Sequence, residues 1–144
     1  METAEMGRVL TEATIENLKD VWDAERNMLP QEKVRRITVK DALVDSGATL
    51  VALPSRLIRQ LGLKAMYKRP VTSSAGRSES MLYEAVRLTI LGRSCTMDVM
   101  EVPDGVPVLI GQLPLEHLDL VIDPRNCVLT GNPAHGGEHV YELY

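Results

Sequence analysis

The chain has 144 residues, a formal net charge of −4, 44% hydrophobic residues and 25% charged residues. These values are typical of a soluble globular protein, and we expect a single domain over residues 1–144. Phe is absent and only one Trp and four Tyr occur, so the core must be aliphatic. The negative charge disfavours nucleic acid as a partner, because phosphate binding needs a basic surface.

The chain shows no sign of a targeting or membrane segment. The start, METAEMGRVL, lacks a basic stretch followed by an apolar one, so we expect no signal peptide. No apolar run is long enough to cross a bilayer, so a membrane is not an expected partner. Cys95 and Cys127 are too few for a disulfide framework, and we expect reduced thiols in a cytoplasmic protein.

The first part of the chain predicts two strands that lead to an acidic turn. Residues 7–16 are rich in Val, Thr and Ile with partial alternation, which favours a strand. Residues 17–32 are polar and predict a long connection with a short helical turn. Residues 33–44 form the second predicted strand, and it ends at Asp45.

An apolar strand over residues 50–53 and a short helix follow the acidic turn. The helix begins after Pro54, carries apolar residues at helical spacing, and should end at Gly62. Residues 70–87 then predict a hairpin. Its middle, residues 73–80, is small and polar, which suits a projecting loop.

The remaining chain alternates predicted strands and turns, with one more short helix. In chain order we expect strands at 85–91, 95–102 and 106–111, a helix at 113–118, a hairpin over 119–130, and a terminal strand in VYELY, residues 140–144. Many short strands with only two short helices favour a small all-β barrel. The segments LVDSGATLVALPSRLIRQLG and VLIGQLPLEHL echo each other, because each runs from an apolar strand through Gly and Leu-Pro to a helix.

Two motifs give the chain a resemblance to a known family. LVDSGAT, residues 43–49, resembles the signature of aspartic proteases, in which two hydrophobic residues precede Asp-Thr/Ser-Gly-Ala. VLIGQ resembles the hydrophobic-hydrophobic-Gly element that follows the flap in retropepsins, the single-domain retroviral-type proteases. The order of elements also matches over residues 7–131, with the long N-terminal segment of solitary bacterial forms. The resemblance implies a small closed barrel of the retropepsin type with a flap hairpin.

The resemblance also assigns roles to particular residues. It implies that Asp45 is catalytic, and that Ser46 bonds across a dimer axis and braces the two turns. The implied active-site turn is Ser46, Gly47, Ala48 and Thr49; the flap is Ser74, Ala75, Gly76, Arg77 and Ser78; and the supporting apolar-Gly element is Leu109, Ile110 and Gly111. No metal and no cofactor are implied.

Counting the acidic motif predicts a homodimer. Peptide hydrolysis by carboxyl groups needs two of them, one ionised and one protonated. The chain supplies Asp-Ser-Gly once, and Asp104-Gly105 lacks the hydroxyl residue. The second carboxyl must therefore come from another copy of the chain. The expected partners are thus a second subunit and a peptide substrate, and segments 1–6 and 132–144 are candidates for the dimer interface.

Other interpretations stay open at the level of sequence. Asp45-Ser46-Gly47 could be an ordinary polar turn. The same dimer could bind a peptide without cutting it, since Gln112-Leu113 replaces the Arg-Asn of retroviral enzymes and the flap holds only Gly76. His135 and His139 fit the H-x-x-E-H pattern of a zinc hydrolase, but two glycines between them oppose the helix that this motif needs.

Overall fold

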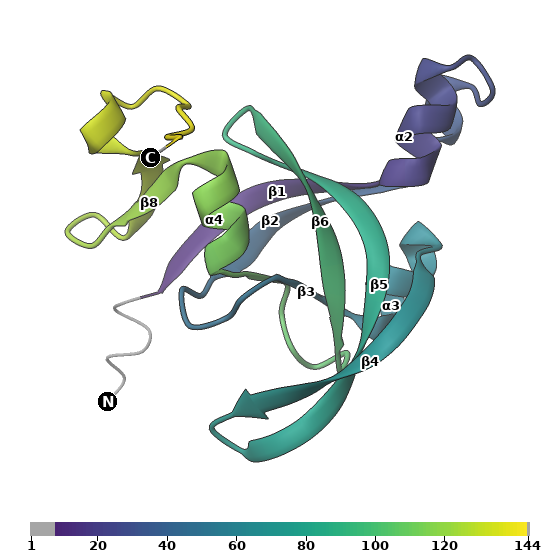
Figure 1. The fold of residues 1–144 in the computed structure, drawn as a ribbon, viewed down its shortest axis with the longest axis horizontal. Helices are drawn as coiled ribbons and strands as arrows, with labels where there is room; N and C mark the ends of the chain where they lie inside the picture. The colour runs from purple at the N-terminus through teal and green to yellow at the C-terminus, as the bar shows by residue number, and fades with distance from the viewer. Residues whose placement is uncertain (1–7, 144) are drawn as a thin grey trace.

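A computed structural model describes residues 8–143, and most of them lie in strands (Figure 1). Seven strands form one sheet in the order β1-β2-β7-β3-β6-β5-β4, and β8 and β9 form a separate two-stranded sheet. β1 also pairs with β5, so the pairing returns to its starting strand and closes a ring. The prediction of an all-β fold with few short helices is confirmed. The terminal segment 1–6 lies outside the described residues.

The N-terminal part contains two strands joined by more helix than expected. β1 (Val9–Asn17) pairs antiparallel with β2 (Arg36–Val44), as predicted. Between them lie α2 (Leu18–Glu25) and the 3-10 turn η1 (Gln31–Lys33). Asn17 accounts for the helix start, because its side chain accepts a hydrogen bond from the Asp20 backbone N–H and donates another to the Leu61 carbonyl.

The segment after the acidic turn folds as predicted. β3 (Val51–Pro54) runs directly into α3 (Ser55–Leu61). Gly62 ends this helix with φ of 66°, a left-handed conformation that glycine adopts without steric cost.

The predicted hairpin is longer and its loop much shorter than expected. β4 (Lys64–Ser73) pairs with β5 (Gly76–Ile90), and the register continues to the pair Ser73 and Gly76. The prediction of a loop over residues 73–80 is therefore wrong, and only Ser74 and Ala75 form the turn. Backbone pairing across the hairpin holds even small polar residues extended, which composition does not reveal. β5 also pairs with β6 (Arg93–Val102).

The C-terminal part matches the prediction until the last segment. β7 (Leu109–Ile110), α4 (Gln112–Leu118), β8 (Leu120–Asp123) and β9 (Val128–Gly131) lie close to the expected positions. The predicted terminal strand is wrong for residues 140–143, which pair with no strand in the described chain; Tyr144 lies outside it. After the 3-10 turn η2 (Pro133–His135), two glycines of positive φ turn the chain, and the Val140 N–H binds the Asp119 carboxylate instead of a neighbouring strand.

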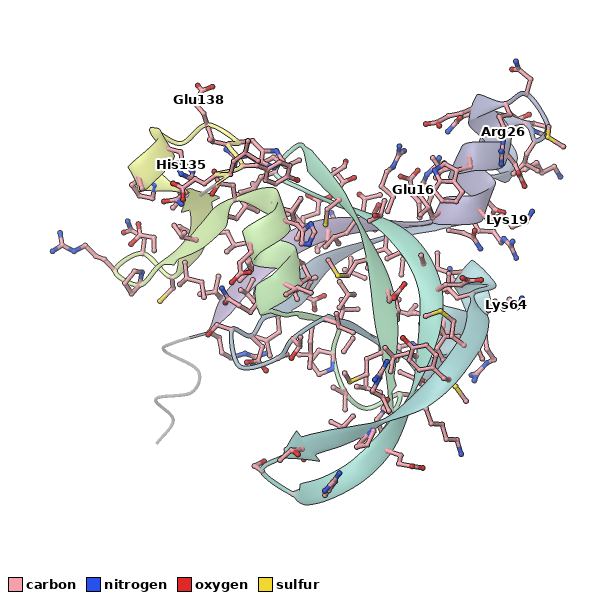
Figure 2. All side chains as sticks on the ribbon, viewed as in Figure 1. Glu16, Lys19, Arg26, Lys64, His135 and Glu138 are labelled. Carbon is pink, nitrogen blue, oxygen red and sulfur yellow. The ribbon has the colours of Figure 1, made fainter. Side chains whose placement is uncertain are left out.

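The core is aliphatic, as the composition requires, and charged side chains that are buried are paired. Ile15, Leu53, Leu88 and Ile110 are among its most buried members. Glu16, at the foot of α2 in Figure 2, binds Arg36 at 3.0 Å and Arg87 at 2.9 Å. In the described residues we find no helix that is long and apolar enough to cross a membrane.

Candidate active site

The acidic turn holds its carboxylate with backbone groups. Asp45 follows β2, and its backbone N–H donates to the Ile110 carbonyl at 2.9 Å. The Gly47 N–H donates to the Asp45 Oδ1 at 3.0 Å, and the Ala48 N–H donates to the Asp45 carbonyl at 3.0 Å. A Cβ at position 47 would lie 3.3 Å from the Asp45 Oδ1, a tight contact. The turn therefore fixes one carboxylate oxygen and leaves the half-buried side chain open to solvent.

A glycine that directly follows β7, far from the turn in sequence, holds the turn in place. The Gly111 N–H donates to the Leu50 carbonyl at 3.0 Å, and the next two N–H groups donate to the Ala48 and Thr49 carbonyls at 2.8 and 3.0 Å. A Cβ on Gly111 would lie 2.5 Å from the Leu50 oxygen, so only glycine allows this approach. The two echoing segments predicted from sequence thus brace each other.

Strand pairing brings the supporting element to the turn. β7 lies between β2 and β3, with Leu109 beside Leu43 and Ile110 beside both Val44 and Val51. The Gln112 side chain donates to Glu116 at 3.2 Å, within α4. The Arg-Asn pair that is absent here is therefore not needed for the bracing of the turn, which uses backbone N–H groups.

A groove of about 450 Å³ lies between the acidic turn and the β4–β5 hairpin. Asp45 and Gly47 line one side, and Val71, Thr72 and Ser73 of β4 together with Ser74 line the other. Among the described residues that line this groove, Asp45 is the one with an ionisable side chain. The groove therefore presents a single carboxyl group against apolar and hydroxyl-bearing walls.

The structure brings together some of the predicted site residues and adds others. Of the predicted turn, Gly47, Ala48 and Thr49 line the groove, whereas Ser46 is exposed outside its lining. Of the predicted flap, Ser74 lines the groove, while Ala75, Gly76, Arg77 and Ser78 are exposed at the hairpin tip. Leu109 lines it, with Ile110 buried behind. Ser73, which the sequence placed in the projecting loop, also lines it. Sequence reasoning missed Leu50, Ala52, Val71, Thr72, Met100 and Val102.

The one sequence signal that could have indicated the missed residues is the alternation of side chains along a strand. Met100 and Val102 are two apart on β6, so their side chains project from the same face. That face borders the groove only because β6 lies next to β3. This parallel pairing joins residues far apart in the chain, so no local sequence pattern predicts it.

The two histidines of the zinc pattern contact different residues. His135, labelled in Figure 2, binds Asp119 through Nδ1 and Glu142 through Nε2, both at 2.7 Å. His139 Nε2 lies 3.0 Å from the His117 carbonyl oxygen. The helical turn η2 ends at His135, so no helix presents both histidines on one face. Within residues 8–143 no three potential ligand side chains gather into a metal site, and the structure gives the zinc interpretation no support.

Comparison with known proteins identifies the family. The model of a family described as aspartyl protease matches residues 24–113, more than half of the chain, including the acidic turn, the β4–β5 hairpin and the Leu109–Gly111 element. None of the curated proteins matches the chain.

The solved structures that are similar to the chain include two retroviral proteases. The EIAV protease complexed with the inhibitor HBY-793 has 16% sequence identity and a TM-score of 0.48, with 76% of this chain and 86% of that chain covered. The simian foamy virus (mac) protease, solved in solution, has 16% identity and a TM-score of 0.46, with 74% and 90% covered. The family match over residues 24–113 confirms the resemblance expected from LVDSGAT, and the chain belongs to the aspartyl protease family.

Proposed function

We propose that the protein is an aspartic endopeptidase that works as a homodimer, with one Asp45 carboxyl group from each subunit at a shared site. The observation that carries this proposal is the position of Asp45, held by its own turn on one side of a groove that the β4–β5 hairpin covers on the other. The family membership supports the same reaction.

The chemistry requires a second carboxyl group from outside the chain's own groove. Asp45 is the sole ionisable side chain among the described residues that line it, so one subunit supplies half of the acid–base pair. Two subunits related by a twofold axis would bring the two Asp45 side chains together. Two carboxyl groups about 3 Å apart share one proton, and aspartic proteases are themselves the established example of such a pair.

The proposed reaction has two steps, the addition of water to the peptide carbonyl and the cleavage of the C–N bond. The ionised Asp45 takes a proton from a water molecule as its oxygen attacks the peptide carbonyl carbon, and the protonated Asp45 of the second subunit donates to the carbonyl oxygen. The resulting tetrahedral diol then loses a hydroxyl proton to one carboxylate. The amide nitrogen gains the proton that the first Asp45 took from the water, the C–N bond breaks, and an acid and an amine leave, so the pair again holds one proton.

The groove suits an extended peptide. Such a peptide binds through its main chain and places alternate side chains in pockets. The described lining offers apolar side chains from Leu50, Val71, Met100, Val102 and Leu109 and hydroxyl groups from Thr49, Thr72, Ser73 and Ser74. The β4–β5 hairpin would act as the flap, which closes over the peptide and excludes water. We also propose a cytoplasmic location, which rests only on the content of two cysteines.

The test is cleavage of a mixed peptide library by the wild type, by Asp45→Asn, and by Asp41→Asn as the matched control. Asp41 is an exposed residue of β2, so the control removes the same charge four residues earlier. We expect cleavage by the wild type and by Asp41→Asn, inhibition by a statine-type compound, and no cleavage by Asp45→Asn. If the wild type and both variants bind peptide but cleave none, the protein is a peptide-binding module and not an enzyme. Activity that chelators abolish would point to a metal hydrolase.

A further inference from the structure

We propose that Glu101 is a positioning residue that fixes the β4–β5 hairpin at its height above the groove. The inference rests on the proposed function, since it assigns the hairpin's anchor in the same site. It starts from the place where the hairpin leaves the sheet. β5 pairs with β6 as far as Leu82, opposite Met100, and its continuation toward the tip pairs with β4.

Glu101 lies at this branch point. The last residues of β6 run beside β3 instead of β5, with Glu101 next to Leu53 and Val102 next to Pro54. In Figure 1 the hairpin extends away from the end of β6 across the lower part of the molecule. A bend of the hairpin at the point where it leaves β6 would therefore lie close to Glu101.

Glu101 joins three elements at that point with hydrogen bonds. On β5, the Ser80 hydroxyl donates to the Glu101 carbonyl at 2.6 Å, and the Tyr83 hydroxyl donates to Oε1 at 3.1 Å. At the start of α3, the Ser55 hydroxyl donates to Oε2 at 2.6 Å. Both carboxylate oxygens are thus used, one toward β5 at the base of the hairpin and one toward the start of α3.

The same residue is linked to the groove through its neighbours on β6. Met100 and Val102 both line the groove, and alternation along a strand directs the Glu101 side chain to the opposite face. Burial raises the pKa of Tyr83, and its bond to Glu101 adds to the shift, which agrees with a phenol that stays protonated and donates this bond. The anchor and the groove wall are therefore parts of one strand.

Loosening this anchor should weaken peptide binding more than the chemical step. The roof residues Val71 to Ser74 belong to the anchored hairpin, whereas Asp45 is held by its own turn and by Gly111. A hairpin that opens more often would hold the bound peptide less well and raise KM. Loss of folded enzyme would instead lower the apparent kcat and leave KM unchanged.

The experiment combines hydrogen exchange of full-length protein with peptidase kinetics. The variants are Tyr83→Phe, which removes one hydroxyl, Glu101→Leu, and Glu101→Gln, which keeps an oxygen for the Tyr83 bond and an N–H for Ser55. Tyr67→Phe is the matched control, because Tyr67 lies on the same hairpin with its ring under the Arg69 guanidinium, 4.7 Å away.

We expect exchange in residues 79–84 to be about two- to tenfold faster in Tyr83→Phe and Glu101→Leu, with a KM raised by about the same factor. Glu101→Gln and Tyr67→Phe should stay near the wild type. Exchange in Tyr83→Phe that equals the control overturns the proposal, whatever happens to Glu101→Leu. If the wild type cleaves no peptide, the proposed function is wrong, but the exchange rates still test whether Glu101 holds the hairpin.

Discussion

Replacing Gly111 with alanine tests whether the acidic turn depends on the close approach of β7. Gly111 has φ of −89° and ψ of −171°, a conformation open to any residue, so the substitution adds a steric cost alone. The new Cβ would lie 2.5 Å from the Leu50 oxygen, 2.7 Å from the Ala48 oxygen and 2.7 Å from the Thr49 carbonyl carbon. All three are backbone atoms, which cannot rotate away as a side chain could.

The expected cost follows from these contacts. Overpacking at a buried position costs about 1–3 kcal/mol. Moving the chain to relieve the overlap would also stretch the hydrogen bonds from the N–H groups of Gly111, Gln112 and Leu113, each worth about 1 kcal/mol. We therefore expect Gly111→Ala to lower the free energy of unfolding by about 3 kcal/mol. With a urea m-value of about 2 kcal/mol/M, the unfolding midpoint should fall by about 1.5 M.

Gly105→Ala is the matched control. Gly105 lies in the loop before β7, and a Cβ there would meet nothing within 4 Å. We expect this variant to match the wild type or to be slightly more stable. Urea unfolding at one protein concentration measures both, since dimer formation would make the midpoint depend on concentration. A loss below about 1 kcal/mol in Gly111→Ala, or equal losses in the two variants, would refute the steric argument.

Three further predictions concern charge and assembly. Hydrogen bonds to Glu142 and Asp119 raise the pKa of His135. The stabilisation of the C-terminal segment by protonated His135 is therefore fully present below the unfolded pKa of about 6.5. It is lost as pH rises through the folded pKa. An NMR titration should show a lower His135 pKa in Glu142→Gln, and an unchanged value would contradict the pairing. Burial opposes ionisation of Glu16, but its bonds to Arg87 and Arg36 prevail and hold its pKa low. The stabilisation by ionised Glu16 is therefore present above about pH 4.3 and lost as pH falls through the folded pKa. Glu16→Gln should make the free energy of unfolding less dependent on pH in the acid range. Equal pH dependence in the variant and the wild type would argue against this. Sedimentation of active enzyme should give twice the chain mass of 16.0 kDa; active monomer at high concentration would exclude a shared site.

The local features of the fold could be predicted from sequence because local chemistry determines them. Gly62 ends α3, and the small residues after Asp45 form the turn, since both depend on neighbours along the chain. The groove could not be predicted, because Val71 and Met100 reach it only through pairings between distant strands. The terminal strand failed for a related reason: alternation in VYELY indicated a strand, but the Asp119 carboxylate binds the Val140 N–H that a strand would need.

The bracing of the acidic turn by Gly111 has a consequence for synthesis of the protein. The turn is complete only when the chain between Asp45 and Leu113 has been made, because its outer hydrogen bonds come from residues 111–113. A nascent chain that has emerged only as far as the β4–β5 hairpin would hold Asp45 by the Gly47 and Ala48 N–H groups alone. In the proposed enzyme, a ribosome-bound chain would therefore stay inert toward its neighbours until β7 has joined the sheet.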